Sequence, residues 1–143
     1  MVSDTLLPPR RSLSGDRLDT PVRDLMRPGV IVLSEHASVA QAQRAMLAHG
    51  VHAVLVLEDG TGRPAGWVTS RGLLGWAARD VALACAREAV TEPPVAIEPS
   101  ASAREALEAI DRTGAARLLV VRDGDGLPEG VVSDVDLLRE VAR

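Results

Sequence analysis

The stretch Gly130–Ser133, followed by Asp136, holds the residues of this sequence best suited to binding a small molecule. Ser133 is predicted to lie where a strand gives way to a helix, and the free N–H groups of a helix start favour an anion. Asp136, one turn further on, can accept hydrogen bonds from two vicinal hydroxyls, and Gly130 lets another group approach the backbone closely. The spacing Ser133-x-x-Asp136 also fits a variant of the helix capping box, which needs no ligand. Both interpretations remain open from the sequence.

No set of residues forms a recognisable catalytic or metal-binding pattern. His36, His49 and His52 cannot be assembled with a nearby Ser or Asp into a nucleophile, a base and an orienting group. His49-x-x-His52 has a metal-like spacing, but it straddles Gly50, where a helix is expected to end. The single cysteine, Cys85, offers no second thiolate for zinc. We therefore expect neither an enzyme nor a metal site.

The composition excludes several classes of protein. The 143 residues include 16 basic and 20 acidic side chains, for a net charge of −4, and the only aromatic residues are two tryptophans. A nucleic-acid-binding protein needs a basic surface and usually aromatic platforms, so no nucleic acid is expected as a partner. No apolar run approaches the roughly 20 residues that span a membrane, and no signal peptide is evident at the N-terminus. A soluble cytoplasmic protein is the expectation.

The sequence contains one motif twice. Displaced by 64 positions, residues 23–79 align without gaps onto residues 87–143, and 18 of the 57 pairs are identical. The identities fall on turn residues and apolar positions, including the Leu-Leu pairs Leu73-Leu74 and Leu137-Leu138. Two halves with this pattern are expected to share one backbone fold.

Each repeat is predicted to follow the order β-α-β-β-α. Capping boxes mark helix starts at Ser38 and Ser102, each followed three residues later by Gln or Glu, and Gly50 and Gly114 end these helices. The strands are continuous apolar runs, so both of their faces should be covered. The predicted strands are Val30–Leu33, Ala53–Leu57 and Gly66–Thr69 in the first repeat, and Pro94–Ile97, Arg117–Val121 and Gly130–Ser133 in the second.

The ends of the repeats are predicted to be helical as well. A short helix opens the first repeat, with Thr20 as its cap and Pro21 at its first position. A last helix starts near Arg71 in the first repeat and near Val135 in the second.

These elements predict an α/β (α+β) fold in which two β-α-β-β-α repeats pack on each other about a pseudo-two-fold axis. A single repeat of this size would leave much of its apolar surface exposed to water. The expected division is a flexible tail at 1–19, a first repeat at 20–79, a linker at 80–86 and a second repeat at 87–143.

The two repeats, each ending in Gly-apolar-apolar-Thr/Ser before a helix with Leu-Leu, resemble a pair of cystathionine-β-synthase (CBS) domains, the Bateman module. The resemblance extends over residues 21–143 and is most specific at 117–138, which reads RLLVVRDGDGLPEGVVSDVDLL. It implies a stand-alone regulatory sensor that binds an adenosine-containing ligand in the cleft between the repeats. AMP, ADP, ATP, S-adenosylmethionine and NAD all fit that class, and none is implied as a required cofactor.

The resemblance also implies roles for single residues of the second repeat. The Asp136 carboxylate is expected to bond ribose hydroxyls, with Ser133 near the phosphate or sugar. Val95 and Val131 are expected to form apolar walls.

Two basic residues precede the middle strands, where the resemblance implies contacts with ligand phosphates. Arg117 offers a forked donor suited to phosphate, and His52 adds charge when it is protonated. An ion pair with a surface carboxylate is the alternative for Arg117, and a half-exposed polar side chain is the alternative for His52.

The first repeat departs from the binding pattern. Thr69 keeps the hydroxyl and is a candidate ligand contact, but Gly72 stands where Asp136 stands in the second repeat, so the carboxylate that would bind ribose is missing. Trp67 replaces the equivalent of Val131. Its indole either stacks on a purine or fills space in the protein interior, and the sequence favours filling.

A ligand-free structural or interaction module is the competing hypothesis. Such a module would act by forming a homodimer or by binding a partner protein. Trp76, on the last helix of the first repeat, is predicted to be an exposed apolar residue near the interface of that homodimer.

Overall fold

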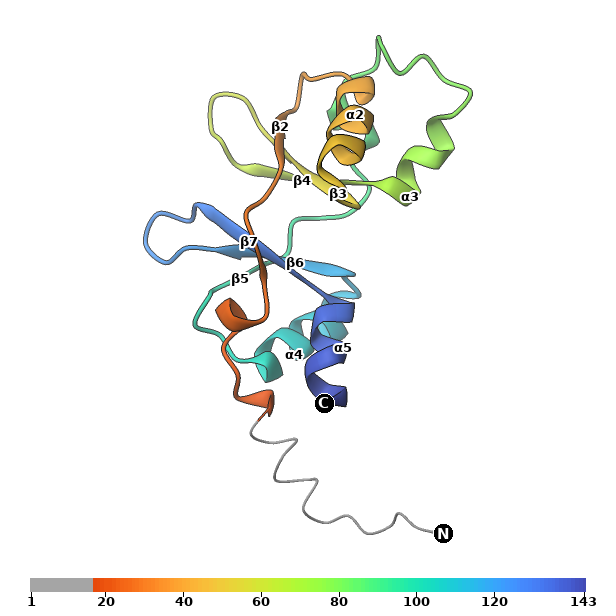
Figure 1. Cartoon of the computed structure of the whole chain (residues 1–143). Helices are drawn as coiled ribbons and strands as arrows, with labels where there is room; N and C mark the ends of the chain where they lie inside the picture. The colour runs from red at the N-terminus through yellow and green to blue at the C-terminus, as the bar shows by residue number, and fades with distance from the viewer. Residues whose placement is uncertain (1–16) are drawn as a thin grey trace, which may run out of the picture. The chain divides into compact units, whose positions relative to one another are not determined.

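A computed structural model describes residues 17–143, which form two compact units (Figure 1). Unit 1 combines the N-terminal segment up to Gly29 with Val95–Arg143, and unit 2 comprises Val30–Pro94. Most of the predicted tail, residues 1–16, lies outside the described residues. In the described part, no helix is both long enough and apolar enough to cross a membrane.

Unit 2 is a three-stranded sheet with helices on one face. The strand order is β2-β3-β4, with β2 parallel and β4 antiparallel to the central β3. Val54, Val56 and Val68 of the sheet pack against α2, α3 and two 3₁₀ turns. The elements are β2 (Val32–Ser34), α2 (Val39–His49), β3 (Ala53–Leu57), β4 (Pro64–Thr69), α3 (Ser70–Leu73), η2 (Leu74–Trp76) and η3 (Ala86–Ala89).

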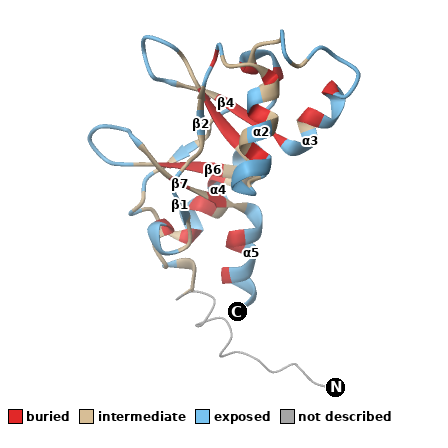
Figure 2. Ribbon diagram, turned by 45° about the horizontal axis from the view of Figure 1, so that its top comes forward, coloured by how far each residue is buried: buried red, intermediate tan, exposed pale blue. Residues whose placement is uncertain are grey.

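Unit 1 repeats this arrangement with one additional strand. Its sheet order is β1-β7-β6-β5, and Leu118, Val120 and Val132 pack against α4 and α5. Bands of buried residues alternate with exposed ones along α5, as expected for a helix lying on a sheet (Figure 2). The elements are η1 (Val22–Asp24), β1 (Arg27–Pro28), β5 (Ala96–Ile97), α4 (Ala103–Thr113), β6 (Arg117–Val121), β7 (Pro128–Ser133) and α5 (Asp134–Ala142).

The starts and ends predicted for the central helix of each repeat, α2 and α4, are confirmed. Ser38 and Ser102 each accept a hydrogen bond from the backbone three residues on, completing a capping box. Gly50 and Gly114 end α2 and α4 at φ values of 63° and 74°, a conformation that favours glycine. The β-α-β-β-α order is therefore present in each repeat.

The opening segment of each repeat packs on the body of the other repeat. Val22 donates its N–H to the carbonyl of Ala101, and Ala86, 64 positions later, donates to the carbonyl of Ala37 in the same way. Val22 and Ala86 are both fully buried. Each compact unit thus consists of the body of one repeat and the opening segment of the other.

The predicted cap at Thr20 is wrong. The η1 turn has Pro21 at its N-cap position and no side-chain capping bond. The Thr20 hydroxyl donates instead to the carboxylate of Glu140 on α5, at 2.8 Å. The exchange of opening segments explains this difference, because it places Thr20 beside α5.

Candidate functional site

Ser133 and Asp136 form a reciprocal pair at the start of α5. Ser133 Oγ accepts the N–H of Asp136 at 3.1 Å, and Asp136 Oδ2 accepts the N–H of Ser133 at 2.9 Å. The capping-box interpretation of this spacing is therefore confirmed. It uses only one of the two carboxylate oxygens of Asp136, whose side chain is 7% exposed.

The other carboxylate oxygen, Asp136 Oδ1, lies between two guanidinium groups. Arg27 Nε and Arg139 Nη1 are each 3.6 Å from it, which is an ion-pair distance but longer than a hydrogen bond. Oδ1 therefore keeps lone pairs for a further donor. Both arginine side chains are about two-thirds exposed, at 66% and 67%, so most of their N–H groups face solvent.

Sequence reasoning missed both arginines. Arg139 stands three residues after Asp136 on a predicted helix, and this spacing is a recognised signal for an ion pair. Arg27 is placed by β1, which pairs with β7 so that Arg27 lies opposite Val131. No local pattern indicates that pairing, since Arg27 precedes β7 by about a hundred residues.

The remaining predicted binding residues of the second repeat lie on the sheet that leads to this pair. Arg117 is the β-ladder partner of Ser133 on the neighbouring strand. Val131 lies opposite Leu119, whose N–H bonds the carbonyl of Val95. The structure thus brings Arg117, Val131 and Val95 into the same sheet as Ser133. Val95 and Val131 are half-buried, which leaves part of each side chain accessible.

The first repeat has the hydroxyl but not the carboxylate. Thr69 Oγ1 accepts the N–H of Gly72 at 3.0 Å and so caps α3. A Cβ atom on Gly72 would lie 3.1 Å from Thr69 Oγ1 and 3.3 Å from Thr91 Oγ1, so a larger side chain fits there only if those neighbours give way. His52, just before β3, is exposed, and its carbonyl accepts the N–H of Ser70.

Trp67 fills space in the interior. It lies opposite Leu55 in the β3–β4 ladder and is 1% exposed. Its indole nitrogen has no hydrogen-bond partner among residues 17–143. The interpretation of Trp67 as a space-filling residue is the one that this burial supports.

The expectation that Trp76 is exposed is wrong. Its side chain is only 6% exposed and packs in the core of unit 2, with the Arg79 guanidinium 3.7 Å from the ring centroid. The chain after β4 forms four residues of α-helix and then a 3₁₀ turn, so Leu73 and Trp76 face inward while Leu74 faces outward. Trp76 therefore offers little exposed apolar surface to a second copy.

The equivalent position in the second repeat is also buried. Glu140, 64 residues after Trp76, is 5% exposed and accepts hydrogen bonds from Thr20 Oγ1 and Arg143 Nη1, both at 2.8 Å. The Thr20 bond, with help from Arg143, lowers the pKa of Glu140 below its ordinary value. A buried carboxylate thus occupies the place of an indole because two donors satisfy it.

Comparisons with known proteins agree with this architecture. The family model described as "CBS domain" matches the chain twice, at residues 22–79 and 86–143. Among curated proteins, no sequence matches significantly.

Solved structures provide the other comparisons. Hypoxic Response Protein I, solved with two coordinated zinc ions, is 28% identical, with 84% of this chain and 98% of that chain covered and a TM-score of 0.68. The CBS domain of a bacterial CNNM/CorC family Mg²⁺ transporter, in complex with ATP, is 19% identical, with coverages of 93% and 94% and a TM-score of 0.78. CBSX2 in complex with AMP is 21% identical, with coverages of 86% and 96% and a TM-score of 0.66.

Proposed function

This chain belongs to the CBS domain family, and we propose that it is a non-catalytic regulatory module that binds an adenosine-containing ligand at Ser133 and Asp136 of the second repeat. The burial and hydrogen bonding of the Asp136 carboxylate support this proposal most. It is nearly buried, it is fixed by the capping box through Oδ2, and its Oδ1 still has acceptor capacity. A ribose presents two neighbouring hydroxyl donors, which suit such an oxygen.

Basic side chains around Asp136 favour a phosphorylated ligand within that class. Arg27 and Arg139 both lie within 3.6 Å of one oxygen, so their nitrogens are no more than twice that distance apart. One phosphate group can bridge two donors at such a separation, and guanidinium groups suit phosphate oxygens. We place Arg117, beside Ser133, as a third contact for phosphate, with Val95 and Val131 against the base or sugar.

The relatives support the ligand class. The CNNM/CorC domain was solved with ATP and CBSX2 was solved with AMP. We propose a phosphorylated ligand (AMP, ADP, ATP or NAD) for this chain ahead of S-adenosylmethionine, which has no phosphate, because two guanidinium groups adjoin the proposed ribose acceptor. In the first repeat we assign Thr69 and His52 at most an accessory role, since Gly72 provides no carboxylate.

A titration tests the proposal directly. The full chain is titrated with AMP, ADP, ATP, S-adenosylmethionine, NAD and adenosine by calorimetry. At least one of the nucleotides is expected to bind, and Asp136→Asn is expected to weaken that binding by roughly 10- to 100-fold, the loss of a hydrogen bond to a charged group. Asn keeps an oxygen for the Ser133 N–H, so the helix cap is retained.

Matched controls separate the contacts. Arg27→Gln and Arg139→Gln are expected to weaken AMP but not adenosine, whereas Arg104→Gln, which breaks an exposed ion pair with Asp19, is expected to leave both unchanged. The proposal is overturned if no compound of the panel binds, or if Asp136→Asn binds nucleotide as tightly as wild type.

A second candidate function, self-association, is favoured by one specific observation. The second leucine of each Leu-Leu pair is exposed: Leu74 at 76% and Leu138 at 63%. On α5, Leu138 is joined by Val135 and Val141 at intervals of three residues, with exposures of 47% and 39%. Exposed apolar side chains of this kind suit an interface with a second copy, because a two-fold interface places the same surface of each partner against the other.

Light scattering over a range of protein concentrations tests this candidate. The wild type is expected to be a dimer, and Leu74→Arg combined with Leu138→Arg is expected to be a monomer of unchanged stability. Leu83→Arg, at another exposed leucine, is the control and is expected to remain dimeric. A wild type that stays monomeric at all concentrations would contradict the dimer.

A further inference from the structure

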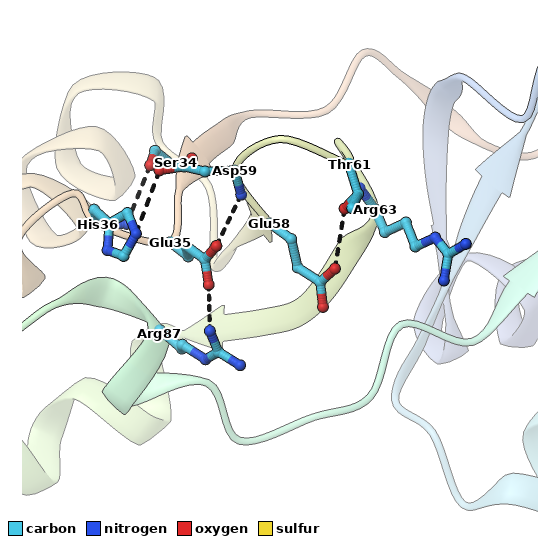
Figure 3. A network of polar contacts seen from close by, with 8 residues as sticks. All are labelled: Ser34, Glu35, His36, Glu58, Asp59, Thr61, Arg63 and Arg87. Carbon is cyan, nitrogen blue, oxygen red and sulfur yellow. Dashed lines mark hydrogen bonds and ion pairs between the residues drawn. The ribbon is translucent and has the colours of Figure 1, made fainter.

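A separate polar cluster lies in unit 2, at the end of β2 and in the connection between β3 and β4. It contains Glu35, His36 and Asp59, with Ser34 and Arg87 beside them (Figure 3). One ligand atom of each of Glu35, His36 and Asp59 lies within 4.8 Å of the others. His36 Nε2 is 3.5 Å from Asp59 Oδ2. One imidazole and two carboxylates therefore lie near one another.

Neighbouring groups orient the two carboxylates. Ser34 Oγ donates to Asp59 Oδ1 at 2.7 Å, and the N–H of Asp59 donates to Glu35 Oε2 at 2.8 Å. Arg87 donates to Glu35 Oε1. Asp59 Oδ2 receives no hydrogen bond from this network, and Glu35 Oε2 keeps a second lone pair. Supporting bonds of this kind orient the ligands in metal sites.

The charges in the cluster are not balanced. Glu35 and Asp59 carry two negative charges, Arg87 carries one positive charge, and a neutral His36 adds none. Two carboxylates this close repel each other, and a divalent cation between them would remove that repulsion.

The second repeat shows that the fold does not require this cluster. At the positions 64 residues later, Pro99 replaces Glu35, Ser100 replaces His36 and Glu98 replaces Ser34, and only Asp123 keeps its carboxylate. The strands around them nevertheless pair in the same register: Leu33 lies opposite Val56, and Ile97 lies opposite Val120. The fold therefore does not require Glu35 and His36 at these positions of the first repeat.

We propose that Glu35, His36 and Asp59 bind one divalent transition-metal ion of the zinc class. One imidazole nitrogen with two carboxylate oxygens suits zinc better than calcium or magnesium, which take oxygen ligands. Two ligands at about 2.1 Å from a tetrahedral ion lie about 3.4 Å apart, close to the separation of His36 Nε2 and Asp59 Oδ2. The ligand oxygen of Glu35 lies within 4.8 Å of the other two ligand atoms, so a shift of its side chain by up to about 1.4 Å brings it to the same spacing.

An open pocket adjoins the cluster at Asp59, which lines it together with Ser34, Glu58 and Thr61. Water or an exogenous ligand can approach Asp59 from this pocket. The sequence predicts no metal site, because no local spacing joins Glu35 and Asp59. These two residues come together only through the pairing of β2 with β3.

The experiment is a titration of the full chain, freed of metal, with Co²⁺ and Zn²⁺. Wild type is expected to bind one ion per chain, and bound Co²⁺ is expected to give the visible absorption of a low-coordinate site with one nitrogen ligand. His36→Gln and Asp59→Asn are each expected to weaken binding about tenfold or more. Both side chains are more than half exposed, so both variants are expected to fold, which circular dichroism verifies.

Two controls make the assignment specific. His49→Gln removes a histidine outside the cluster, and Asp123→Asn removes the equivalent carboxylate of the second repeat; both are expected to bind metal as wild type does. The proposal is overturned if wild type shows no saturable binding of either ion, if His36→Gln binds as well as wild type, or if His49→Gln abolishes binding.

Discussion

Gly130→Ala is expected to destabilise the protein by about 3 kcal/mol. A Cβ atom at this position would lie 2.6 Å from the carbonyl oxygen of Arg27 and 2.7 Å from the sulfur of Met26. The carbonyl belongs to β1, whose pairing with β7 places Arg27 in the unit, so the backbone cannot move away without breaking that pairing. Glycine at position 130 therefore allows the chain's own opening segment, at Met26 and Arg27, to lie directly against β7.

Gly66→Ala is expected to have the same effect or a larger one. Its Cβ atom would lie 2.5 Å from Val90 and 2.6 Å from the carbonyl oxygen of Glu92. Gly66 also has a φ of 148°, which side chains rarely adopt, so strain adds to the clash. Urea denaturation of each variant measures the free energy of unfolding.

Gly75→Ala is the matched control for both glycines. Its Cβ atom would meet nothing within 4 Å, and its φ is not in the left-handed region. Its free energy of unfolding is expected to stay the same or rise by up to about 1 kcal/mol, since Ala restricts the unfolded chain. If Gly66→Ala and Gly130→Ala are as stable as Gly75→Ala, the close packing of the opening segments is not present in solution.

Gly66 and Gly130 contact the opening segments, and the packing of these segments is the part of the fold that the sequence could not predict. Capping boxes, terminal glycines and apolar strands are local patterns, and they located α2, α4, β3 and β6 correctly. The repeat predicted two copies of one backbone. However, the sequence pattern of an opening segment is the same whether that segment packs on its own repeat or on the other repeat. Long-range contacts distinguish them, among them the backbone hydrogen bonds of Val22 and Ala86.

The same limit applies to the candidate sites. The Ser133–Asp136 pair follows from spacing within one turn of helix, and its role as a cap is confirmed. Arg27 reaches Asp136 only through the exchanged segment, and Glu35 reaches Asp59 only through strand pairing. Trp76 is buried because the chain forms a short α3 and a 3₁₀ turn in place of the continuous helix that the sequence predicts.

Trp76→Ala is expected to lower the free energy of unfolding by about 3–5 kcal/mol, the usual cost of truncating a buried indole. The ring packs in a core cluster with Val54, Val68 and Leu73, so truncation leaves a cavity among them. The variant also loses the contact of Arg79 with the face of the ring. Urea denaturation followed by circular dichroism gives the measurement independently of the missing tryptophan.

Leu74→Ala provides the comparison within the same turn. Its side chain is 76% exposed, so truncation is expected to change the free energy of unfolding by less than about 0.5 kcal/mol at a protein concentration where the chain is monomeric. The two substituted positions are two residues apart, and the Trp76 side chain faces the core whereas the Leu74 side chain faces solvent. If Trp76→Ala were as mild as Leu74→Ala, the indole would not be part of the core. A surface role for Trp76 would then be restored. A large difference between the variants would instead show that the indole packs in the core with residues of α2 and the sheet. Leu74 and its equivalent Leu138 then remain as exposed apolar side chains that a second copy could contact.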